Sequence, residues 1–147
     1  LLAQNGETIV YRDFAHAPSK VKATLQAVRA QFPQKKLIGL LELHTYSSLN
    51  KEFMQEYKGV LDDADEGAVF YSKHALEIKR LPHLEKEVVK EGFAKGSLNI
   101  FNTREELQSW LDGLDYNNSV VLLMSSGNYD GMDVEAFAKT ITQSVVG

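Results

Sequence analysis

The chain reads Thr8-Ile9-Val10-Tyr11-Arg12-Asp13-Phe14-Ala15-His16-Ala17-Pro18 near its N-terminus, and this stretch predicts a strand that passes directly into a helix. Residues 9–12 are mostly β-branched or aromatic, as in strands. Pro18 suits the first position of a helix, because the N–H that proline lacks would be unpaired there. An acid and an imidazole, Asp13 and His16, therefore fall at the end of a strand. In open α/β sheets, ligands bind at this edge.

Two interpretations of Asp13 remain open. Its carboxylate can accept hydrogen bonds from two hydroxyl groups, such as those of a ribose diol, while His16 can stack on a base or donate to an oxygen. Alternatively, Asp13 only caps the turn between the strand and the helix, which is the commoner role of such a residue. An isolated Asp-x-x-His pattern does not decide between the two.

Strand and helix patterns alternate along the rest of the chain. Further strands are expected at 36–43, 68–71, 98–101 and 120–124. The helical faces, with apolar residues spaced three or four apart, comprise Val21, Leu25, Val28 and Phe32; Leu49, Phe53, Met54 and Tyr57; Leu84, Val88 and Val89; Leu107, Trp110, Leu111 and Leu114; and Val134, Phe137, Ile141 and Val145. Thr103 and Glu106 form a capping-box pattern. This order predicts a single α/β domain whose mainly parallel sheet has helices on both faces.

Composition excludes several classes of protein. The 147 residues carry a net charge of −4, which argues against a nucleic-acid partner. The absence of cysteine excludes disulfides and thiol chemistry and fits a reducing compartment, so we expect a cytoplasmic protein. No apolar run is long enough to span a bilayer, and no membrane partner is expected. The chain lacks an initiator Met, so we expect it to be a piece of a longer protein.

Polar residues gather after the expected strands. They are Asp13 and His16 after the first; Glu42, His44, Thr45, Tyr46, Ser47 and Ser48 after the second; Ser72, Lys73 and His74 after the third; and Ser125, Ser126, Gly127, Asn128, Tyr129, Asp130 and Gly131 after the fifth. Each residue alone is typical of a turn. Because parallel strands end at one edge of the sheet, we expect these groups to lie close together.

Missing motifs narrow the chemistry further. The chain has no Gly-x-x-x-x-Gly-Lys-Ser/Thr loop and no Gly-x-Gly-x-x-Gly after the first strand, so it cannot build a P-loop or a dinucleotide fingerprint. Ser125-Ser126-Gly127-Asn128 lacks the glycine that precedes the serine in a nucleophile elbow. The aspartate and lysine that a phosphoacceptor receiver domain needs after its third and fifth strands are also absent.

Three segments resemble motifs of one family. The run Tyr11-Arg12-Asp13-Phe14-Ala15-His16-Ala17-Pro18 resembles the Asp-aromatic-Ala-His-x-Pro motif that opens the C-terminal domain of Mur ligases. The segments 42–48 and 124–132 resemble the segments after the second strand and a late strand of that domain, in the same order. Within the family, the chain looks closest to the muropeptide-recycling ligases, and the L-alanine-adding ligases are near neighbours.

The resemblance implies a Rossmann-like, three-layer α/β domain with a six-stranded sheet. Residues 1–147 would be the C-terminal domain of a longer chain and would close over a central ATPase domain, preceded by an N-terminal domain that binds the UDP-linked substrate. The cofactors would be ATP and Mg²⁺, bound mainly by the central domain. The partners would be UDP-N-acetylmuramate, a peptide or amino acid, and the other domains of the same chain.

The resemblance also implies roles for individual residues. Asp13 would bind the ribose of ATP, and His16 would lie against the nucleotide. His44 is the candidate catalytic residue. His44, Ser47 and Ser48 would face the phosphates or the acyl phosphate. The residues implied to meet the incoming amine or peptide are Lys73, His74, Ser125, Ser126 and Asn128. No metal ligand is assigned to this chain.

The chain departs from the family pattern at two places. Relatives often have a second histidine where this chain has Ala17, and an arginine near Thr45 or Ser48 where this chain has none. Lys51 is the candidate replacement for that cation. A second function of another class also stays open, namely a freestanding Rossmann-like module that binds a ligand without catalysis.

Overall fold

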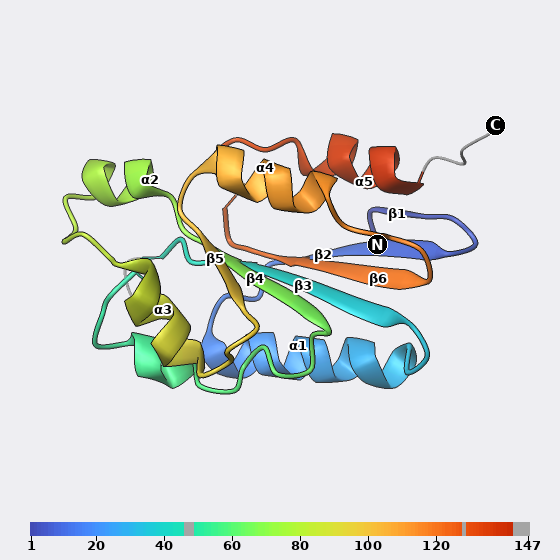
Figure 1. The fold of residues 1–147 in the computed structure, drawn as a ribbon, viewed down its shortest axis with the longest axis horizontal. Coiled ribbons are helices and arrows are strands. Elements are labelled where there is room, and N and C mark those ends of the chain that lie inside the picture. Colours follow the sequence, from blue (N-terminus) through green and yellow to red (C-terminus); the bar gives the residue numbers. More distant parts are fainter. Residues whose placement is uncertain (46–48, 128, 143–147) are drawn as a thin grey trace.

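The computed structural model describes residues 1–45, 49–127 and 129–142, and these form a six-stranded sheet with helices on both faces (Figure 1). The strands are β1 (Ala3–Gln4), β2 (Thr8–Asp13), β3 (Lys36–Glu42), β4 (Glu66–Phe70), β5 (Asn99–Phe101) and β6 (Ser119–Met124). The helices are α1 (Pro18–Gln31), η1 (Met54–Tyr57), α2 (Lys73–Ile78), α3 (Lys86–Phe93), α4 (Arg104–Asp112) and α5 (Val134–Thr142). The expected three-layer α/β fold is confirmed.

The sheet has the strand order β1-β2-β6-β3-β4-β5. Only β1 runs antiparallel to its neighbour, and the other pairs are parallel. The periodicity of the sequence predicts five of these strands. The resemblance to Mur ligases implies a sheet of six strands but does not locate the sixth. The strand that the pattern missed is β1, whose two residues are too few to show alternation.

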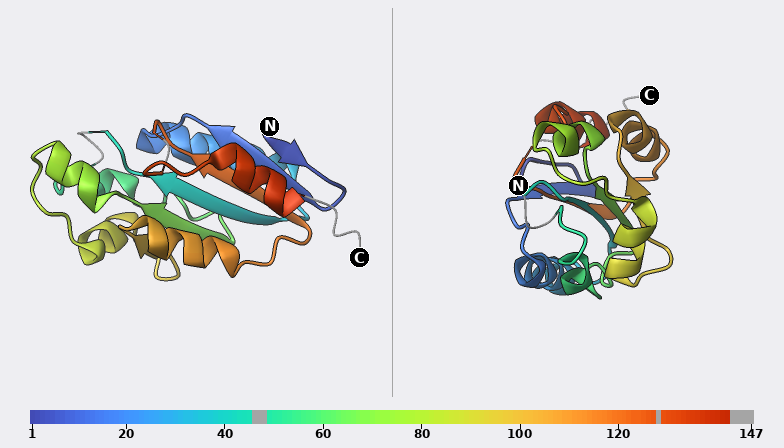
Figure 2. Two further views of the ribbon diagram at one scale, coloured as in Figure 1. Left: turned by 90° about the horizontal axis from the view of Figure 1, so that it is seen from above. Right: turned by 90° about the vertical axis from the view of Figure 1, so that its left-hand side faces the viewer.

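Each face of the sheet packs against its own set of helices (Figure 2). The β3 residues Leu37 and Leu41 belong to the apolar core on the α1 side, whereas Ile38 and Leu40 belong to the core on the α4 and α5 side. All four are fully buried, and burying one such side chain contributes about 1.5–3 kcal/mol. The nearly continuous apolar run of β3 is thus explained by its burial on both faces.

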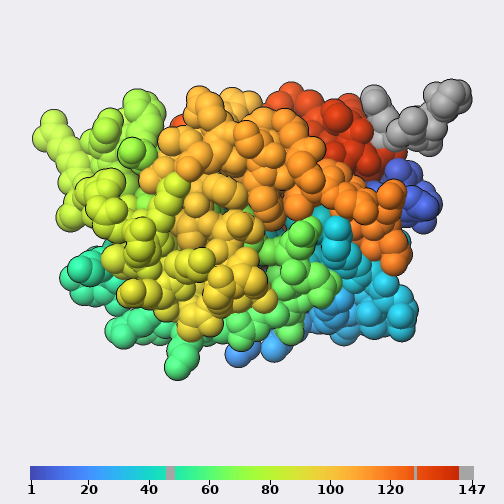
Figure 3. Space-filling view, viewed as in Figure 1, coloured from blue at the N-terminus to red at the C-terminus, as the bar shows by residue number. Residues whose placement is uncertain are grey.

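The β5 edge of the sheet is flanked by α3 and α4, and β5 itself is partly exposed between them (Figure 3). Figure 3 shows the side chains around α3, β5 and α4 packed side by side over this part of the molecule.

The capping prediction for α4 is confirmed, because the hydroxyl oxygen of Thr103 accepts a hydrogen bond from the backbone N–H of Glu106 at 3.3 Å. Within the described residues, no helix has both the length and the apolar character needed to cross a membrane.

The helix predicted from the spacing of Leu49 to Tyr57 is wrong. In its place the chain forms turns and the short 3₁₀ helix η1. Tyr57 stacks on Phe93 of α3 with ring centroids 4.9 Å apart, and Gly59 takes a φ of 75° just after η1. Contacts with α3 therefore set the backbone here, and they override the local spacing.

A short helix that the sequence pattern does not show, α2, begins directly after β4. The hydroxyl oxygen of Ser72 caps it by accepting a hydrogen bond from the N–H of Ala75 at 3.0 Å. Only Leu76 of its six residues is buried, so no apolar periodicity marks it. Lys73 and His74 consequently lie on the first turn of a helix instead of in a loop.

Candidate functional site

Four strand ends meet along one edge of the sheet. The order β2, β6, β3, β4 places the last residues of these strands side by side, with Asp13 opposite Met124 and Glu42 opposite Phe70. Beyond the ladder, the N–H of Ser125 donates to the backbone oxygen of Asp13 at 3.0 Å. The expected convergence of strand-end residues is therefore present at this edge.

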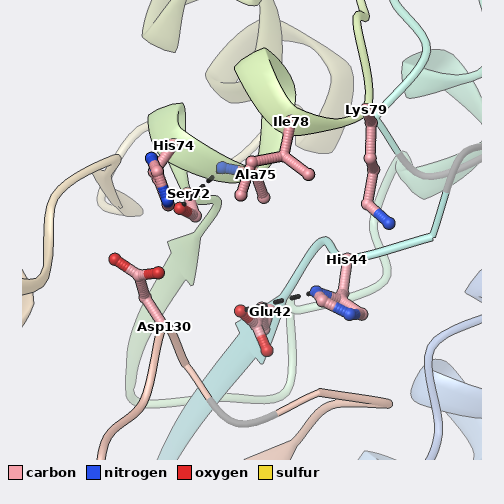
Figure 4. A pocket seen from close by; sticks show the side chains of 8 residues that line it. All are labelled: Glu42, His44, Ser72, His74, Ala75, Ile78, Lys79 and Asp130. Carbon is pink, nitrogen blue, oxygen red and sulfur yellow. Dashed lines mark hydrogen bonds and ion pairs between the residues drawn. The ribbon is translucent and has the colours of Figure 1, made fainter.

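A pocket of about 220 Å³ lies between the end of β3, helix α2 and the connection from β6 to α5 (Figure 4). Its lining residues are Glu42, His44, Ser72, His74, Ala75, Ile78, Lys79 and Asp130. In Figure 4, His74 and Asp130 lie on opposite sides of the pocket, and Lys79 points toward His44. The pocket therefore combines two carboxylates, two imidazoles and an ammonium group with an apolar wall.

Glu42 is the most buried charged group at this edge, with 2% of its surface exposed. Its Oε1 accepts hydrogen bonds from the Ser125 hydroxyl at 2.5 Å and from the Tyr129 N–H at 3.0 Å. Its Oε2 lies 4.0 Å from Nδ1 of His44. A buried carboxylate requires such partners, since an unpaired one is costly. One oxygen of Glu42 thus holds the β6–α5 connection, and the other is the nearer to His44.

Tyr129 anchors this connection below the pocket. Its hydroxyl lies 3.2 Å from the backbone oxygen of Leu40 and 3.0 Å from that of Met124. Burial raises the pKa of the Tyr129 phenol well above its ordinary value, and the Glu42 carboxylate raises it further. The phenol therefore stays neutral and remains a hydrogen-bond donor at physiological pH.

A second cluster lies at the end of β2. Asp13 uses Oδ1 to accept a hydrogen bond from the N–H of Ala15 at 2.7 Å, and among the described residues its Oδ2 has no partner. The next side chain, Phe14, is 69% exposed. The N-cap of α1 is Ala17 without a side-chain bond, so Asp13 shapes the turn and does not cap the helix. An acceptor beside an exposed aromatic ring is suited to a nucleoside.

Arg12 connects the β2 cluster, which consists of Asp13, Phe14 and His16, to the connection between β6 and α5. Its Nη2 donates to the backbone oxygen of Gly127 at 3.1 Å, and its guanidinium lies 5.5 Å from the centre of the Phe14 ring. His16 lies close by, with its Nδ1 3.0 Å from the backbone oxygen of Phe14. The β2 cluster and the β6–α5 connection are therefore held together by one side chain.

The structure places the predicted site residues in different positions. His44 and His74 line the pocket, whereas Lys73 is exposed and not among its lining residues. Ser125 is 1% exposed, with its hydroxyl bound to Glu42, and Ser126 is exposed. Ser47, Ser48 and Asn128 lie outside the described residues. The binding roles of all these residues, and of Asp13 and His16, stay predictions.

Lys51, the candidate replacement for the missing arginine, is not among the residues that line the pocket of His44. It lines a separate pocket with Leu49, Asn50, Glu52 and residues 81–84. Sequence reasoning missed Lys79, the cation that does line the His44 pocket, because helix α2 was not predicted. Glu42 was noticed only as one polar residue among many. Glu42 is a carboxylate at the end of an otherwise apolar strand that is buried on both faces, and this position is the signal that could have identified it.

Comparison with known proteins identifies the family. A family model described as "Mur ligase, glutamate ligase domain" matches residues 1–127. The chain belongs to the Mur ligase family. Members of this family are ATP-dependent amide ligases, and this chain corresponds to their C-terminal domain.

Curated Mur ligases resemble the chain over most of its length. The UDP-N-acetylmuramate–L-alanine ligase of Lactobacillus acidophilus is 36% identical over 136 residues, which is 92% of this chain and 29% of that protein. The corresponding ligase of Lactococcus lactis subsp. cremoris is 28% identical over 141 residues, 95% of this chain and 30% of that protein. The chain thus spans about 30% of the length of these Mur ligases.

Solved Mur ligases share the fold. A murein peptide ligase of Psychrobacter arcticus superposes with a TM-score of 0.71 at 16% identity, covering 99% of this chain and 29% of that one. A UDP-N-acetylmuramate–alanine ligase of Thermotoga maritima gives 0.56 at 16% identity, covering 95% of this chain and 27% of that one. At such identities the likeness concerns the fold, which is that of the Mur ligase C-terminal domain.

Proposed function

We propose that this chain closes over the nucleotide and the substrates of an ATP-dependent ligase, which joins an amino acid or a short peptide to UDP-N-acetylmuramate. Residues 1–147 would be the C-terminal domain of a longer cytoplasmic protein that also contains a UDP-substrate domain and a central ATPase domain. The observation that carries the proposal is the shared sheet edge, where Arg12 links the Asp13 cluster to the connection that borders the pocket.

The nucleotide would bind at the β2 cluster. Oδ2 of Asp13, without a partner among the described residues, is available to a ribose hydroxyl, and the exposed Phe14 ring and the half-buried His16 offer surfaces for a base. These residues fit a nucleoside but not a triphosphate, because the chain has no P-loop. ATP and Mg²⁺ would accordingly be held mainly by the central domain.

The pocket would receive the amine-bearing substrate. In the proposed reaction the muramyl carboxylate takes the γ-phosphoryl group of ATP and ADP leaves. The bound ammonium group then loses a proton, the resulting amine attacks the carbonyl carbon of the acyl phosphate, and the amide forms as phosphate leaves and the nitrogen loses a second proton. Lys79 and His44 form a side of the pocket suited to a carboxylate or phosphate oxygen, whereas the exposed carboxylate of Asp130 suits an ammonium group. The contribution of this domain is positioning and electrostatics, on which phosphoryl transfer chiefly depends.

Replacing Asp13 by asparagine in the longer ligase tests the nucleotide assignment. The amide keeps the shape and the acceptor for the Ala15 N–H but loses a charge-assisted bond, which is worth about 1.5–3 kcal/mol. We expect the KM for ATP to rise about tenfold or more, while the KM for the amine stays within about twofold. Steady-state kinetics with each substrate varied in turn measures both constants.

Lys73→Ala is the matched control for Asp13→Asn. Lys73 is exposed and lines neither the pocket nor the β2 cluster, so its removal should leave the KM for ATP unchanged. If Asp13→Asn also has the ATP kinetics of the wild type, Asp13 only shapes the turn and the proposed nucleotide contact is wrong.

A further inference from the structure

The connection between β6 and α5 is held by three hydrogen bonds with two side chains, Glu42 and Arg12. Glu42 binds it twice through Oε1, at the Ser125 hydroxyl and at the Tyr129 N–H. The guanidinium of Arg12 holds the backbone oxygen of Gly127. The Glu42 partners are buried, so water cannot easily replace these hydrogen bonds. The backbone on both sides of residue 128 is therefore fixed by side chains of β2 and β3.

The backbone that these contacts hold is unfavourable on its own. Tyr129 and Asp130 have φ values of 54° and 60°, in the left-handed region that residues with a side chain seldom occupy. Two successive residues of this kind persist only where the surroundings enforce them. Without Glu42, the N–H of Tyr129 would lose its acceptor, and the backbone at Tyr129 and Asp130 could relax even while the Tyr129 hydroxyl stays near the backbone oxygens of Leu40 and Met124.

The enforced turn decides where the Asp130 carboxylate lies. Asp130 is exposed and lines the pocket, on the side opposite His74, as Figure 4 shows. Oε2 of Glu42 has His44 as its near neighbour at 4.0 Å. The exposed Asp130 carboxylate thus gives this part of the pocket an anionic character that suits a primary ammonium group, whereas Glu42 is buried and bound to Ser125 and Tyr129.

We propose that Glu42 is a positioning residue, which fixes the turn at Tyr129 and Asp130 and so holds the Asp130 carboxylate in the pocket to bind the ammonium group of the incoming amine. The proposal rests on the proposed ligase function and adds to it a residue for amine recognition and the device that positions it. It separates Glu42, which acts through hydrogen bonds, from Asp130, which acts through its charge.

The kinetic test compares three variants of the longer ligase. Asp130→Asn suits the left-handed backbone but removes the charge, and it should raise the KM for the amine about tenfold with the KM for ATP unchanged. Glu42→Ala should raise the same constant to a similar extent. Glu42→Gln keeps an acceptor oxygen for Ser125 and Tyr129, so it should recover most of the wild-type value.

The double variant Glu42→Ala/Asp130→Asn separates positioning from an independent contact. If Glu42 acts through Asp130, the two increases in the amine KM should not multiply. The amine KM of the double variant should then be at most about twofold higher than that of Asp130→Asn. If the increases in the amine KM multiply in the double variant, or if Glu42→Gln raises this KM as much as Glu42→Ala does, Glu42 is not a positioning residue. An amine KM unaffected by Asp130→Asn would overturn the role of Asp130.

Thr8→Val is the matched control for loss of a buried hydrogen bond. Thr8 is 3% exposed and donates to the backbone oxygen of Tyr116 at 2.6 Å, at the opposite edge of the sheet. It should lower stability and leave the amine KM unchanged. If Glu42→Ala fails to fold, Ser125→Ala, which removes one of the two bonds to Oε1, takes its place and should raise the amine KM by a smaller factor.

Amide hydrogen exchange on the 147-residue chain tests the positioning without any activity. The Tyr129 N–H should exchange at least tenfold faster in Glu42→Ala than in the wild type, and Glu42→Gln should retain most of the protection. Unchanged protection in Glu42→Ala would contradict the proposal. If the wild-type ligase forms no amide bond, the proposed function fails, yet this measurement still decides whether Glu42 holds the turn.

Discussion

The Gly127→Ala variant of the longer ligase is expected to lose about a hundredfold in kcat/KM while remaining folded. A Cβ at this position would lie 2.9 Å from Oε1 of Glu42 and 3.0 Å from Cγ of His44. Glu42 is fixed by its bonds to Ser125 and Tyr129, so the half-exposed His44 ring must move. The expected result is a displaced imidazole in an otherwise intact pocket.

Steady-state kinetics and thermal unfolding of the same preparation test this prediction. Gly96→Ala is the matched control, because a Cβ there has no heavy atom within 4 Å and should change neither kcat/KM nor the unfolding temperature. A Gly127→Ala enzyme with wild-type kcat/KM would show that the position of His44 does not matter for the reaction. It would remove His44 as a candidate catalytic residue.

Gly92→Ala should be the most destabilising of the glycine substitutions considered for this chain. Gly92 lies in α3, where a Cβ would come within 2.6 Å of the Met54 Cγ and 2.7 Å of the Met54 backbone oxygen. Overpacking against backbone costs about 3 kcal/mol, and the better helix propensity of alanine returns about 1 kcal/mol. We expect the free energy of unfolding to fall by about 2 kcal/mol and the Tm by about 6 °C.

Chemical and thermal denaturation of the 147-residue chain measure this loss, again with Gly96→Ala as the control. A Gly92→Ala variant as stable as the wild type would mean that η1 can move away from α3 at no cost. The stacking of Tyr57 on Phe93 argues against such freedom, since it joins the same two segments.

The layered fold could be predicted from the sequence because its central strands are long and apolar. The run around Leu37 to Leu41 cannot be anything but a strand buried on both faces once helical patterns flank it. The failures occurred where local signals are weak. Helix α2 buries only Leu76, and the segment before Gly59 has helical spacing but follows its contacts with α3. Tertiary packing decided both cases.

The candidate site could be predicted from the sequence only in outline. Strand-end reasoning correctly brought His44 and His74 to one pocket, because parallel strands share an edge. It could not show that Glu42 is buried against Ser125, since that bond joins residues 83 positions apart. Nor could it place Lys79 in the pocket without knowing that α2 exists. Side-chain burial and long-range pairing, which no local pattern encodes, separate a pocket residue from a neighbouring turn residue.

We propose that this chain completes an ATP-dependent ligase for UDP-N-acetylmuramate. The direct measurement is amide formation by the longer protein, with UDP-N-acetylmuramate, ATP and Mg²⁺, and with L-alanine or a muramyl peptide as the amine. We predict one ADP and one phosphate released for each amide bond formed with one of these amines. No ATP-dependent product with either amine, from a folded protein, would contradict the account and favour a binding module without catalysis.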